Sequence, residues 1–294
     1  MVFRVSVGIA AYNEERGISH SLKSVLNQKM PPGYELIEII IVSSGSTDGT
    51  NSIVKSFQKS DSRIILIEEP VKRGKSAAVN VIFRTFKGDV LVLSGADSIY
   101  KKSAIYWLLK GFNSNHVGAV CGHIMPINPR QTLWDYGSHL LYDLHHLVTL
   151  IYPQKLSGEL FAIRRQFIRP VPENAGGDDV YLERVVVILK GTITYAPNAV
   201  IYILGPRTAM DYFKQRRRVM CHIKYAEKQT RIKATTMDIP NTMKIFIKNF
   251  SSLFSFHTLP VISMEILARV FAAWDLMRNK VPANWESIIS TKSI

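Results

Sequence analysis

Cysteine is scarce in this sequence, and no hydrophobic run in its last third is long enough to cross a membrane. Only 2 cysteines occur among 294 residues, too few for a disulfide framework, so we expect a reducing compartment. The longest uncharged run there, residues 249–264, has 16 residues and contains Pro260, whereas a spanning helix needs about 20 apolar residues. The first residues lack the charged start, apolar block and cleavage site of a signal peptide, so we expect none.

Acidic residues are also few, because 37 Lys and Arg stand against 23 Asp and Glu and give a net charge of +14. Such an excess suits a nucleic acid, an anionic membrane surface or a phosphorylated substrate. It is concentrated in residues 205–250, where 11 basic and 3 acidic residues give 11 − 3 = +8. With 47% apolar and 20% charged residues, the chain can bury a large core, which excludes a wholly disordered protein. Its length suits one large domain, or one domain with a smaller appendage.

The first half alternates short apolar runs with stretches of helical periodicity. Apolar residues at helical spacing predict helices, and short β-branched runs predict buried strands. We expect strands at residues 4–10, 36–42, 63–68, 89–93, 117–126 and 192–196, and helices at 15–28, 50–60, 76–86 and 134–151. This alternation predicts a mostly parallel sheet flanked by helices. Because ligands bind at the carboxyl ends of such strands, the loops after Ala10, Val42 and Leu93 are the candidate binding loops.

The first two of these loops are rich in small and polar residues. Residues 10–14 read Ala-Ala-Tyr-Asn-Glu, and small side chains let a flat ligand approach the backbone. Residues 43–50 read Ser-Ser-Gly-Ser-Thr-Asp-Gly-Thr and offer hydroxyls and backbone N–H groups to a polar ligand. The same residues also suit an ordinary turn with Asp48 or Thr50 as the helix N-cap.

Charged residues mark two further places near predicted strand ends. Arg73-Gly74-Lys75 precedes a predicted helix, which suits either an anion site or a solvated turn. Asp97 follows a buried strand and offers a carboxylate to a hard divalent cation, or else caps a helix.

The second half contributes two more clusters. Asp178 and Asp179 follow the pair Gly176-Gly177, so one of them suits a general base, and an N-cap pair is the alternative. Residues 215–218 read Gln-Arg-Arg-Arg, and successive arginines point around a helix, so we expect at least one to turn inward toward a phosphate. A basic surface patch is the other interpretation.

The last third shows amphipathic character. Residues 243–256 predict a helix with one apolar face, suited either to a membrane interface or to packing on the main domain. Glu265 and Arg269 form an i,i+4 pair that predicts a helix surface in contact with water.

Taken in order, these motifs, with Gly-Glu-Leu-Phe-Ala-Ile-Arg-Arg at 158–165, resemble the family 2 glycosyltransferases of GT-A fold over residues 4–222. The resemblance implies an α/β domain at residues 1–222 with a Rossmann-like nucleotide-binding half. Residues 223–294 would form a helical, basic and amphipathic extension. The tail from Trp285 to Lys292 is similar to archaeal and bacterial membrane-associated members, which implies a peripheral protein on the cytoplasmic side of the cell membrane.

The activity implied by the resemblance is an inverting sugar transfer from a UDP- or GDP-linked sugar to a hydroxyl of a glycan or lipid-linked acceptor, assisted by Mg²⁺ or Mn²⁺. It implies that Asp179 is the general base with Asp178 beside it, and that Asp97 binds the metal. The other implied site residues are Ala10, Tyr12 and Glu14 at the nucleotide, Ser44 near the base with Asp48 supporting its loop, Arg73 and Lys75 facing the nucleotide, Gly158, Glu159 and Leu160 at the acceptor, and Gln215 and Arg218 at the diphosphate or acceptor.

Three positions differ from the family pattern. Ser43-Ser44 replaces an Asp pair in the base-reading loop, Gly95 replaces the first Asp of the Asp-x-Asp metal motif, and Val219 replaces the aromatic residue of processive synthases. Gly95 leaves a non-catalytic sugar-nucleotide-binding relative as an alternative. A nucleic-acid-binding protein is a further alternative that rests on charge alone, because no nucleic-acid-binding module is recognisable, and we expect no nucleic-acid partner.

Overall fold

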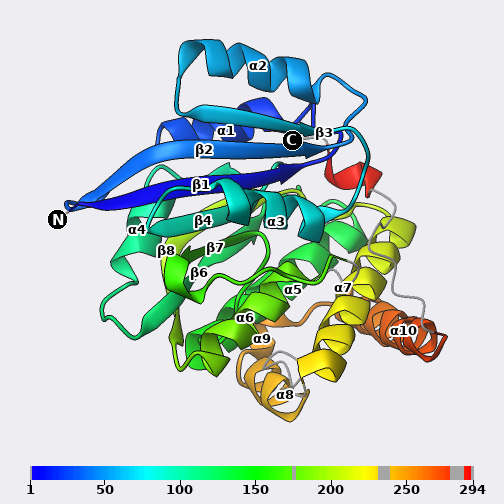
Figure 1. Cartoon of the computed structure of the whole chain (residues 1–294). Helices are drawn as coiled ribbons and strands as arrows, with labels where there is room; N and C mark the ends of the chain where they lie inside the picture. Colours follow the sequence, from blue (N-terminus) through cyan, green and yellow to red (C-terminus); the bar gives the residue numbers. More distant parts are fainter. Residues whose placement is uncertain (1, 174–176, 231–238, 279–287, 293–294) are drawn as a thin grey trace.

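The computed structural model describes residues 2–173, 177–230, 239–278 and 288–292. Its centre is an eight-stranded sheet in the order β3-β2-β1-β4-β7-β6-β8-β5 (Figure 1). The strands are β1 (Phe3–Ala11), β2 (Tyr34–Ser44), β3 (Ile64–Glu69), β4 (Val90–Gly95), β5 (Ile99–Tyr100), β6 (Val117–Pro126), β7 (Leu160–Arg164) and β8 (Thr192–Ile203).

The sheet is mixed, and the first four strands of the chain form a parallel half. β1 pairs in parallel with β2 and β4, and β2 pairs in parallel with β3. β7 runs antiparallel to both β4 and β6, whereas β6 and β8 are parallel. Because of this reversal, the carboxyl ends of β1, β2 and β4 share one edge of the sheet with the beginning of β7.

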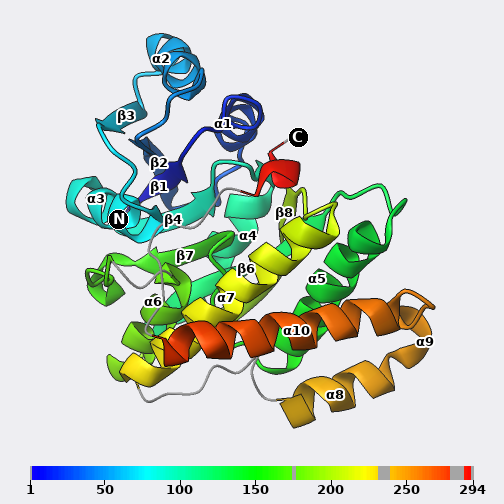
Figure 2. The ribbon, with the colours of Figure 1, turned by 90° about the vertical axis from the view of Figure 1, so that its right-hand side faces the viewer.

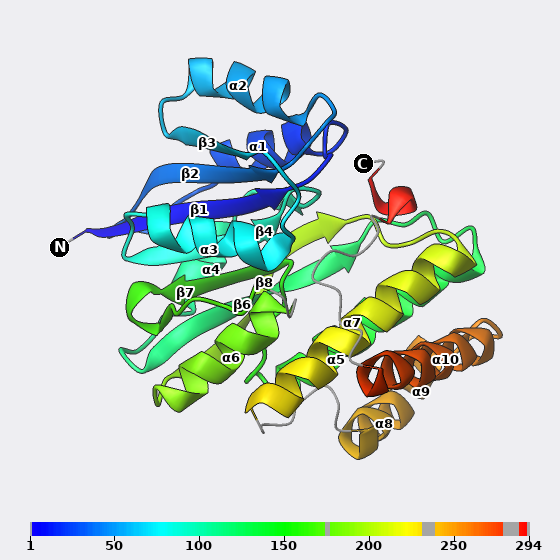
Figure 3. The ribbon, with the colours of Figure 1, turned by 45° about the vertical axis from the view of Figure 1, so that its right-hand side comes forward.

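Helices cover both faces of the sheet, as the turned views show (Figures 2 and 3). The α-helices are α1 (Ile18–Leu26), α2 (Thr50–Ser60), α3 (Lys75–Thr85), α4 (Ala104–Lys110), α5 (Leu133–Ile151), α6 (Asp178–Ile188), α7 (Ala209–Thr230), α8 (Ile239–Lys248), α9 (Phe250–Leu253) and α10 (Thr258–Met277). Short 3₁₀ turns occur at η1 (Arg165–Phe167) and η3 (Ile289–Thr291).

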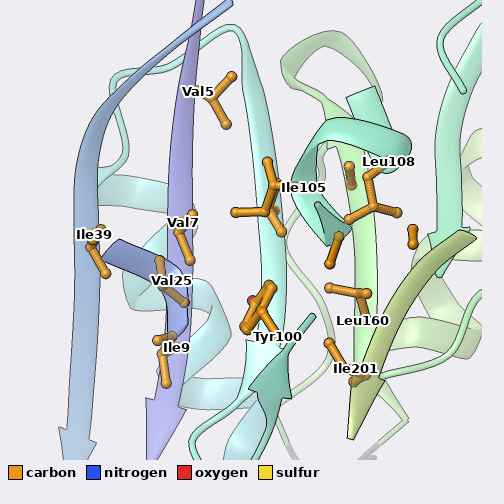
Figure 4. Packing of buried hydrophobic residues seen from close by; sticks show 14 of the residues in the cluster. Val5, Val7, Ile9, Val25, Ile39, Tyr100, Ile105, Leu108, Leu160 and Ile201 are labelled. Carbon is orange, nitrogen blue, oxygen red and sulfur yellow. The ribbon is translucent and has the colours of Figure 1, made fainter. Parts of the chain in front are cut away.

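Strand alternation divides the core into two apolar layers. In β2, Ile39 and Ile41 face one layer, and Ile40 and Val42 face the other. The first layer packs against α1 and α4, and Figure 4 shows its side chains from β1, β2 and α4 meeting in one cluster. The second layer packs against α3 and α6. A strand buried on both faces reads as a continuous apolar run, which is why the Leu36–Val42 run was recognisable.

Most predicted elements are confirmed, with different ends. Residues 50–60 and 117–126 match α2 and β6 to the residue. α1 begins at Ile18, because a turn in which Glu14 O accepts from Gly17 N and Ile18 N precedes it. The N-cap of α2 is Gly49, so the prediction of Asp48 or Thr50 as N-cap is wrong.

The helices after the sheet differ more from expectation. The predicted helix at 243–256 is wrong as a single element, because α8 ends at Lys248 and the short α9 follows. α7 continues through residue 222, and the division into 1–222 and 223–294 stays a prediction. Residues 231–238, the first three residues of the tail 285–292, and Gly176 lie outside the described residues.

α10 has an exposed side, as the Glu265 and Arg269 spacing predicted, but Glu265 is directed toward α7 and its side chain is only 19% exposed. The Glu265 carboxylate accepts hydrogen bonds from Arg216 Nε (2.5 Å) and Tyr212 Oη (3.0 Å) on α7. Figure 2 shows α10 crossing α7, with α8 running beside it. Within the described ranges, no helix is long and apolar enough to span a membrane.

Candidate active site

A cavity of about 780 Å³ begins at the shared edge of β1, β2, β4 and β7 and continues between α5, α7, α8 and α10. Its size is in the range of small-molecule sites. It brings together most of the residues singled out in the sequence, from motifs up to 208 positions apart (10 to 218). Those that line it are Ala10, Tyr12, Glu14, Ser44, Lys75, Asp97, Gly158, Glu159, Asp178, Asp179, Gln215 and Arg218.

Three predicted site residues do not line this cavity. Leu160 is fully buried in β7, as part of the core. The Arg73 guanidinium donates to Glu173 Oε2 at 2.5 Å and lies 3.5 Å from Glu69 Oε1. The Asp48 carboxylate accepts from Thr50 and from Glu15 N (3.2 Å), which joins the β2–α2 turn to the β1–α1 turn.

Hydrogen bonds lock the first two binding loops together. Asn13 Oδ1 accepts from Thr47 N at 2.8 Å, and Asn13 N donates to Ser46 Oγ at 3.1 Å. Gly45 adopts φ +71°, and a Cβ there would lie 2.4 Å from Lys72 N, so only glycine fits. These constraints hold Tyr12 and Ser44 at fixed places on the cavity wall.

Two carboxylates lie beside Gly95, and a third, that of Glu14, lies near Asp97. The β4–β7 register pairs Ser94 with Leu160, which brings Glu159 next to Gly95. A Cβ on Gly95 would lie 2.6 Å from Asp97 Oδ1 and 3.6 Å from Glu159 Oε2. Burial, then the charge of Asp97, raises the pKa of Glu14 to about 7, and burial also raises the pKa of Glu159.

The donor chemistry at this place fits a hard divalent cation, because carboxylate oxygens are its preferred ligands. Asp97 is the residue that would hold the ion, with Glu159 as a neighbouring carboxylate. The part of the chain that the structure describes contains no group of three or more metal-binding side chains suited to hold an ion alone. An ion at Asp97 would therefore need oxygens from a ligand or water, as Mg²⁺ commonly does.

Gly158 links the cation of Lys75 to the carboxylate of Asp179. Lys75 Nζ donates to Gly158 O (2.9 Å), and Gly158 N donates to Asp179 Oδ2 (2.8 Å). Lys75 Nζ also lies 3.5 Å from Asp178 Oδ2. A Cβ at Gly158 would lie 2.8 Å from Lys75 Nζ, so glycine lets the two charged groups approach.

In the network of Lys75, Asp178 and Asp179, attraction between opposite charges opposes the effect of burial on the pKa values. Burial opposes the charged form of Lys75, but Asp178, Glu159 and Asp179 outweigh it and raise the Lys75 pKa. Burial raises the pKa of Asp178, and Lys75 opposes that shift. Asp178 and Asp179 open α6, whose N-cap is Gly177, so neither aspartate is itself the cap.

The three arginines of α7 have three different surroundings. Arg216 binds Glu265, and Arg217 makes a bidentate contact with Asp275 of α10, with both N–O distances 2.6 Å. Arg218 lines the cavity. Burial lowers its pKa, and the charges of Glu159 and Asp97 oppose that shift. Arg216 also lines the cavity while it binds Glu265, and Arg217 holds α10 from the other side. That one of these arginines meets a phosphate stays a prediction.

The far part of the cavity is mostly apolar. Its helical walls carry aliphatic and aromatic side chains, with a few polar groups between them. His145 Nε2 is buried there without a described hydrogen-bond partner, and burial lowers the pKa of Lys155 to about 8. The apolar lining residues are Leu140, Leu144, Val148, Met220, Ile223, Met243, Phe246, Val261, Ile262 and Ile266.

Sequence reasoning missed several cavity residues. Lys72 Nζ lies 4.1 Å from the centroid of the Tyr12 ring, and it is adjacent in sequence to the predicted Arg73. Tyr142 and His145 lie on α5, where nothing in the helical pattern distinguished them from packing residues. Lys292 enters the site from the other end of the chain, and the resemblance of the tail 285–292 to membrane-associated members gives no reason to place it there.

Known proteins are similar to this chain in sequence. The model of the family "Glycosyl transferase family 2" matches residues 6–171, more than half of the chain. "Probable glycosyltransferase YdaM" of Bacillus subtilis is 32% identical over 235 residues, 73% of this chain and 54% of that protein. A poly-beta-1,6-N-acetyl-D-glucosamine synthase of Staphylococcus epidermidis is 28% identical over 225 residues, 72% of this chain and 52% of that protein. The chain thus spans about half the length of these curated relatives.

Solved structures share the fold at low identity. The mannosyltransferase PcManGT from Pyrobaculum calidifontis, in complex with GDP-Man and Mn²⁺, has a TM-score of 0.63 and 20% identity over 96% of this chain and 86% of that chain. Glucosyl-3-phosphoglycerate synthase from Mycobacterium tuberculosis, in complex with Mn²⁺ and UDP, has a TM-score of 0.56 and 20% identity over 79% of this chain and 81% of that chain. These likenesses show a GT-A-like fold.

Proposed function

The chain belongs to glycosyl transferase family 2, and we propose that it transfers a sugar from a nucleoside diphosphate sugar to a hydroxyl acceptor with inversion. The observation that carries the proposal is the meeting of Asp97, Arg218, Lys75 and Asp179 on one cavity at the carboxyl edge of the parallel strands. UDP and GDP are both candidates for the nucleotide, since relatives were solved with GDP-Man and with UDP-GlcNAc.

Asp179 is the proposed general base. Its Oδ2 accepts from Gly158 N at 2.8 Å, which fixes the carboxylate at the cavity wall and leaves Oδ1 for the acceptor hydroxyl. The acceptor oxygen would lose its proton to this carboxylate as it attacks the anomeric carbon, and the bond to the diphosphate would break. Asp178, held by Lys75, lies beside it as a positioning residue.

Arg218 is the proposed partner of the departing diphosphate. It lies on the cavity wall and is attracted by the nearby Asp97 and Glu159, and a guanidinium donates two parallel hydrogen bonds to phosphate oxygens. A Mg²⁺ or Mn²⁺ ion held at Asp97 would, when bound, neutralise further negative charge on the diphosphate. The remaining predicted contacts, from Ala10, Tyr12, Glu14 and Ser44 to the nucleotide and from Gln215 to the diphosphate or acceptor, stay proposals.

The acceptor is proposed to be lipid-linked. The polar part of the cavity continues directly into the apolar part between α5, α7, α8 and α10. A free glycan carries hydroxyls along its whole length and would leave them unpaired against these aliphatic walls, which costs free energy. An acceptor with an apolar tail would fill the same space favourably.

Membrane attachment is proposed through an outer apolar face, defined as the exposed apolar residues of α8, the α9 region and α10. Because α10 turns its charged residues toward α7, its other side exposes apolar groups such as Val270 (59%) and Met277 (72%). Exposed Lys244 and Lys248 lie on α8, beside this face, and suit anionic lipid headgroups. The outer apolar face comprises the exposed apolar residues of this region that do not line the cavity: Ile247, Phe250, Phe254, Phe256, Leu259, Leu267, Val270, Phe271, Trp274 and Met277.

The variant Asp179→Asn tests the catalytic proposal. The amide oxygen still accepts from Gly158 N, so the fold and nucleotide binding should persist while the base is lost. We expect nucleoside diphosphate release from a panel of UDP- and GDP-sugars with Mn²⁺ to fall about 100-fold or more. Asp143→Asn on α5, outside the cavity lining, is the matched control and should keep its rate.

The outcomes separate the two candidate functions. If a folded Asp179→Asn variant releases nucleoside diphosphate at a near-normal rate, Asp179 is not the general base. Binding of nucleotide sugars by the wild type with no release across the whole panel would favour the non-catalytic relative, which the single carboxylate at position 97 beside Gly95 supports.

A further inference from the structure

Residues 288–292 lie against the nucleotide side of the cavity, although the sequence places them about 280 positions after β1. Ser290 N donates to Asp211 Oδ2 (3.2 Å), and Ser290 Oγ accepts from Arg207 N (3.2 Å), which anchors the segment at the start of α7. Ile288 and Thr291 are buried and line the cavity. In Figure 3 the short η3 turn lies beside the end of the sheet where β1 finishes.

Lys292 makes the contact between this segment and the β1–α1 loop. Its ammonium donates to Tyr12 O (2.6 Å), Asn13 O (2.8 Å) and Glu14 Oε1 (2.7 Å). An ammonium has three N–H donors, so these three acceptors use all of them. The Lys292 side chain is 20% exposed and that of Glu14 is 13% exposed, so water screens the pair only weakly.

The loop that Lys292 holds is part of the proposed nucleotide site. Tyr12 and Glu14 line the cavity, and Asn13 between them adopts a positive φ of 52°, a turn conformation that asparagine tolerates better than most residues. Lys292 Nζ also lies 5.7 Å from the Tyr12 ring centroid, on a ring that Lys72 approaches at 4.1 Å.

We propose that Lys292 is a positioning residue for the nucleotide-sugar site, and that it sets nucleotide affinity by holding the Tyr12–Glu14 loop in its binding conformation. The proposal rests on the proposed function for the identity of the ligand. A loop that is already ordered does not have to be ordered when the ligand binds, so affinity rises. Lys292 also neutralises Glu14, whose carboxylate would otherwise repel a diphosphate in the same cavity.

Lys292→Met keeps the length of the side chain and removes its charge, and Lys292→Arg restores the charge and the donors. Lys110→Met, an exposed position at the end of α4, is the matched control. Hydrogen exchange without nucleotide should be about tenfold faster at amides 12–17 in Lys292→Met and unchanged in β6, since charged hydrogen bonds are lost only at the loop. This measurement needs no substrate.

Binding of UDP and GDP by titration calorimetry gives the second measurement. We expect Kd to rise about tenfold in Lys292→Met and to return to within about threefold in Lys292→Arg, while the maximal rate of nucleotide-sugar turnover changes less than about twofold. A structural defect alone would lower the rate and would not be rescued by arginine. Unchanged exchange at 12–17, or unchanged Kd for a nucleotide that the wild type binds, overturns the proposal. If the wild type binds neither nucleotide, the proposed function fails and the exchange result alone decides whether Lys292 orders the loop.

Discussion

The two parts of the cavity are built on different principles. At the sheet edge, backbone geometry does the positioning, because strand ends and tight turns place Tyr12, Ser44 and Asp97 at one edge. Between the helices, side chains do it, because Arg216 and Arg217 bind Glu265 and Asp275 across α7 and α10. The polar part therefore follows from chain connectivity, whereas the apolar part depends on ion pairs between distant helices.

Charged side chains accordingly have different surroundings in the two parts. At the sheet edge, Lys75 and Arg218 line the cavity and can meet a ligand. On α10, Glu265 and Asp275 form ion pairs with α7, and the opposite side of the helix exposes apolar residues. Basic residues thus line the cavity in one place and hold two helices together in the other.

The largest effect is expected from removing an ion-pair partner on α10. Glu265→Ala leaves Arg216 buried without its partner and should lower the free energy of unfolding by about 4 kcal/mol. Asp275→Ala should cost about 1 to 2 kcal/mol, because the Arg217 side chain is 31% exposed and can reach water. Urea unfolding measures both. Equal costs would show that burial of the arginine does not decide how strongly α10 is held.

Asp97→Ala should act on the polar part alone. We expect nucleotide-sugar turnover to fall about 100-fold, because the carboxylate proposed to hold the metal is lost. Mn²⁺ should raise nucleotide affinity in the wild type and not in the variant, as measured by calorimetry with and without the ion. If Asp97→Ala retains the Mn²⁺ effect, another carboxylate, such as Glu159, binds the metal instead.

The outer apolar face should direct binding to anionic vesicles. Leu267→Gln combined with Val270→Gln, two exposed positions outside the cavity lining, should reduce flotation with phosphatidylglycerol-containing liposomes about tenfold, since two exposed apolar groups no longer enter the lipid. Ile188→Gln on α6, also an exposed apolar residue, is the control and should float like the wild type. A wild-type protein that stays entirely in the aqueous fraction refutes membrane attachment.

The smallest effect concerns pH. Burial raises the pKa of both Glu14 and Glu183 to about 7, so the folded state binds more protons than the unfolded state near neutral pH. Stability from these groups is present below their unfolded pKa and is lost as pH rises through about 7.

Urea unfolding at pH 6.5 and 7.5 measures this loss. The wild type should lose about 1 kcal/mol more than Glu14→Gln/Glu183→Gln over this interval. Comparing the two proteins cancels the contributions of the buried histidines. Loss of Glu183 lowers the pKa of Lys155 in the variant, which enlarges the difference in the same direction. A wild type whose stability rises relative to the double variant would contradict the assigned direction.

The parallel half of the sheet was predictable because its signals are local. A doubly buried strand needs a continuous apolar run, and each binding loop follows such a run directly, so Ser44 and Asp97 could be located without coordinates. The family resemblance added roles for Asp179 and Arg218, and the structure brings both to the same cavity. Their individual roles stay predictions for the experiments above.

The helical part was less predictable because periodicity defines the apolar face of a helix but not which neighbouring element that face contacts. Residues 243–256 have one apolar face on a helical wheel, but the chain breaks into α8 and α9 at Asn249. For α10, the Glu265 and Arg269 spacing suggested a wet surface, whereas Arg216 and Tyr212 provide Glu265 with partners that lie 49 and 53 positions away.

The sequence by itself determined the α/β class, the strands other than β5 and β7, and the candidate binding loops, since each of these depends on neighbouring residues. Only the tertiary structure decided that Glu159 lies beside Gly95, that α10 is apolar on its outer side and that Lys292 holds the Tyr12–Glu14 loop. These depend on pairing register and on charges brought together from distant positions, and no local pattern records which distant partner a residue will meet.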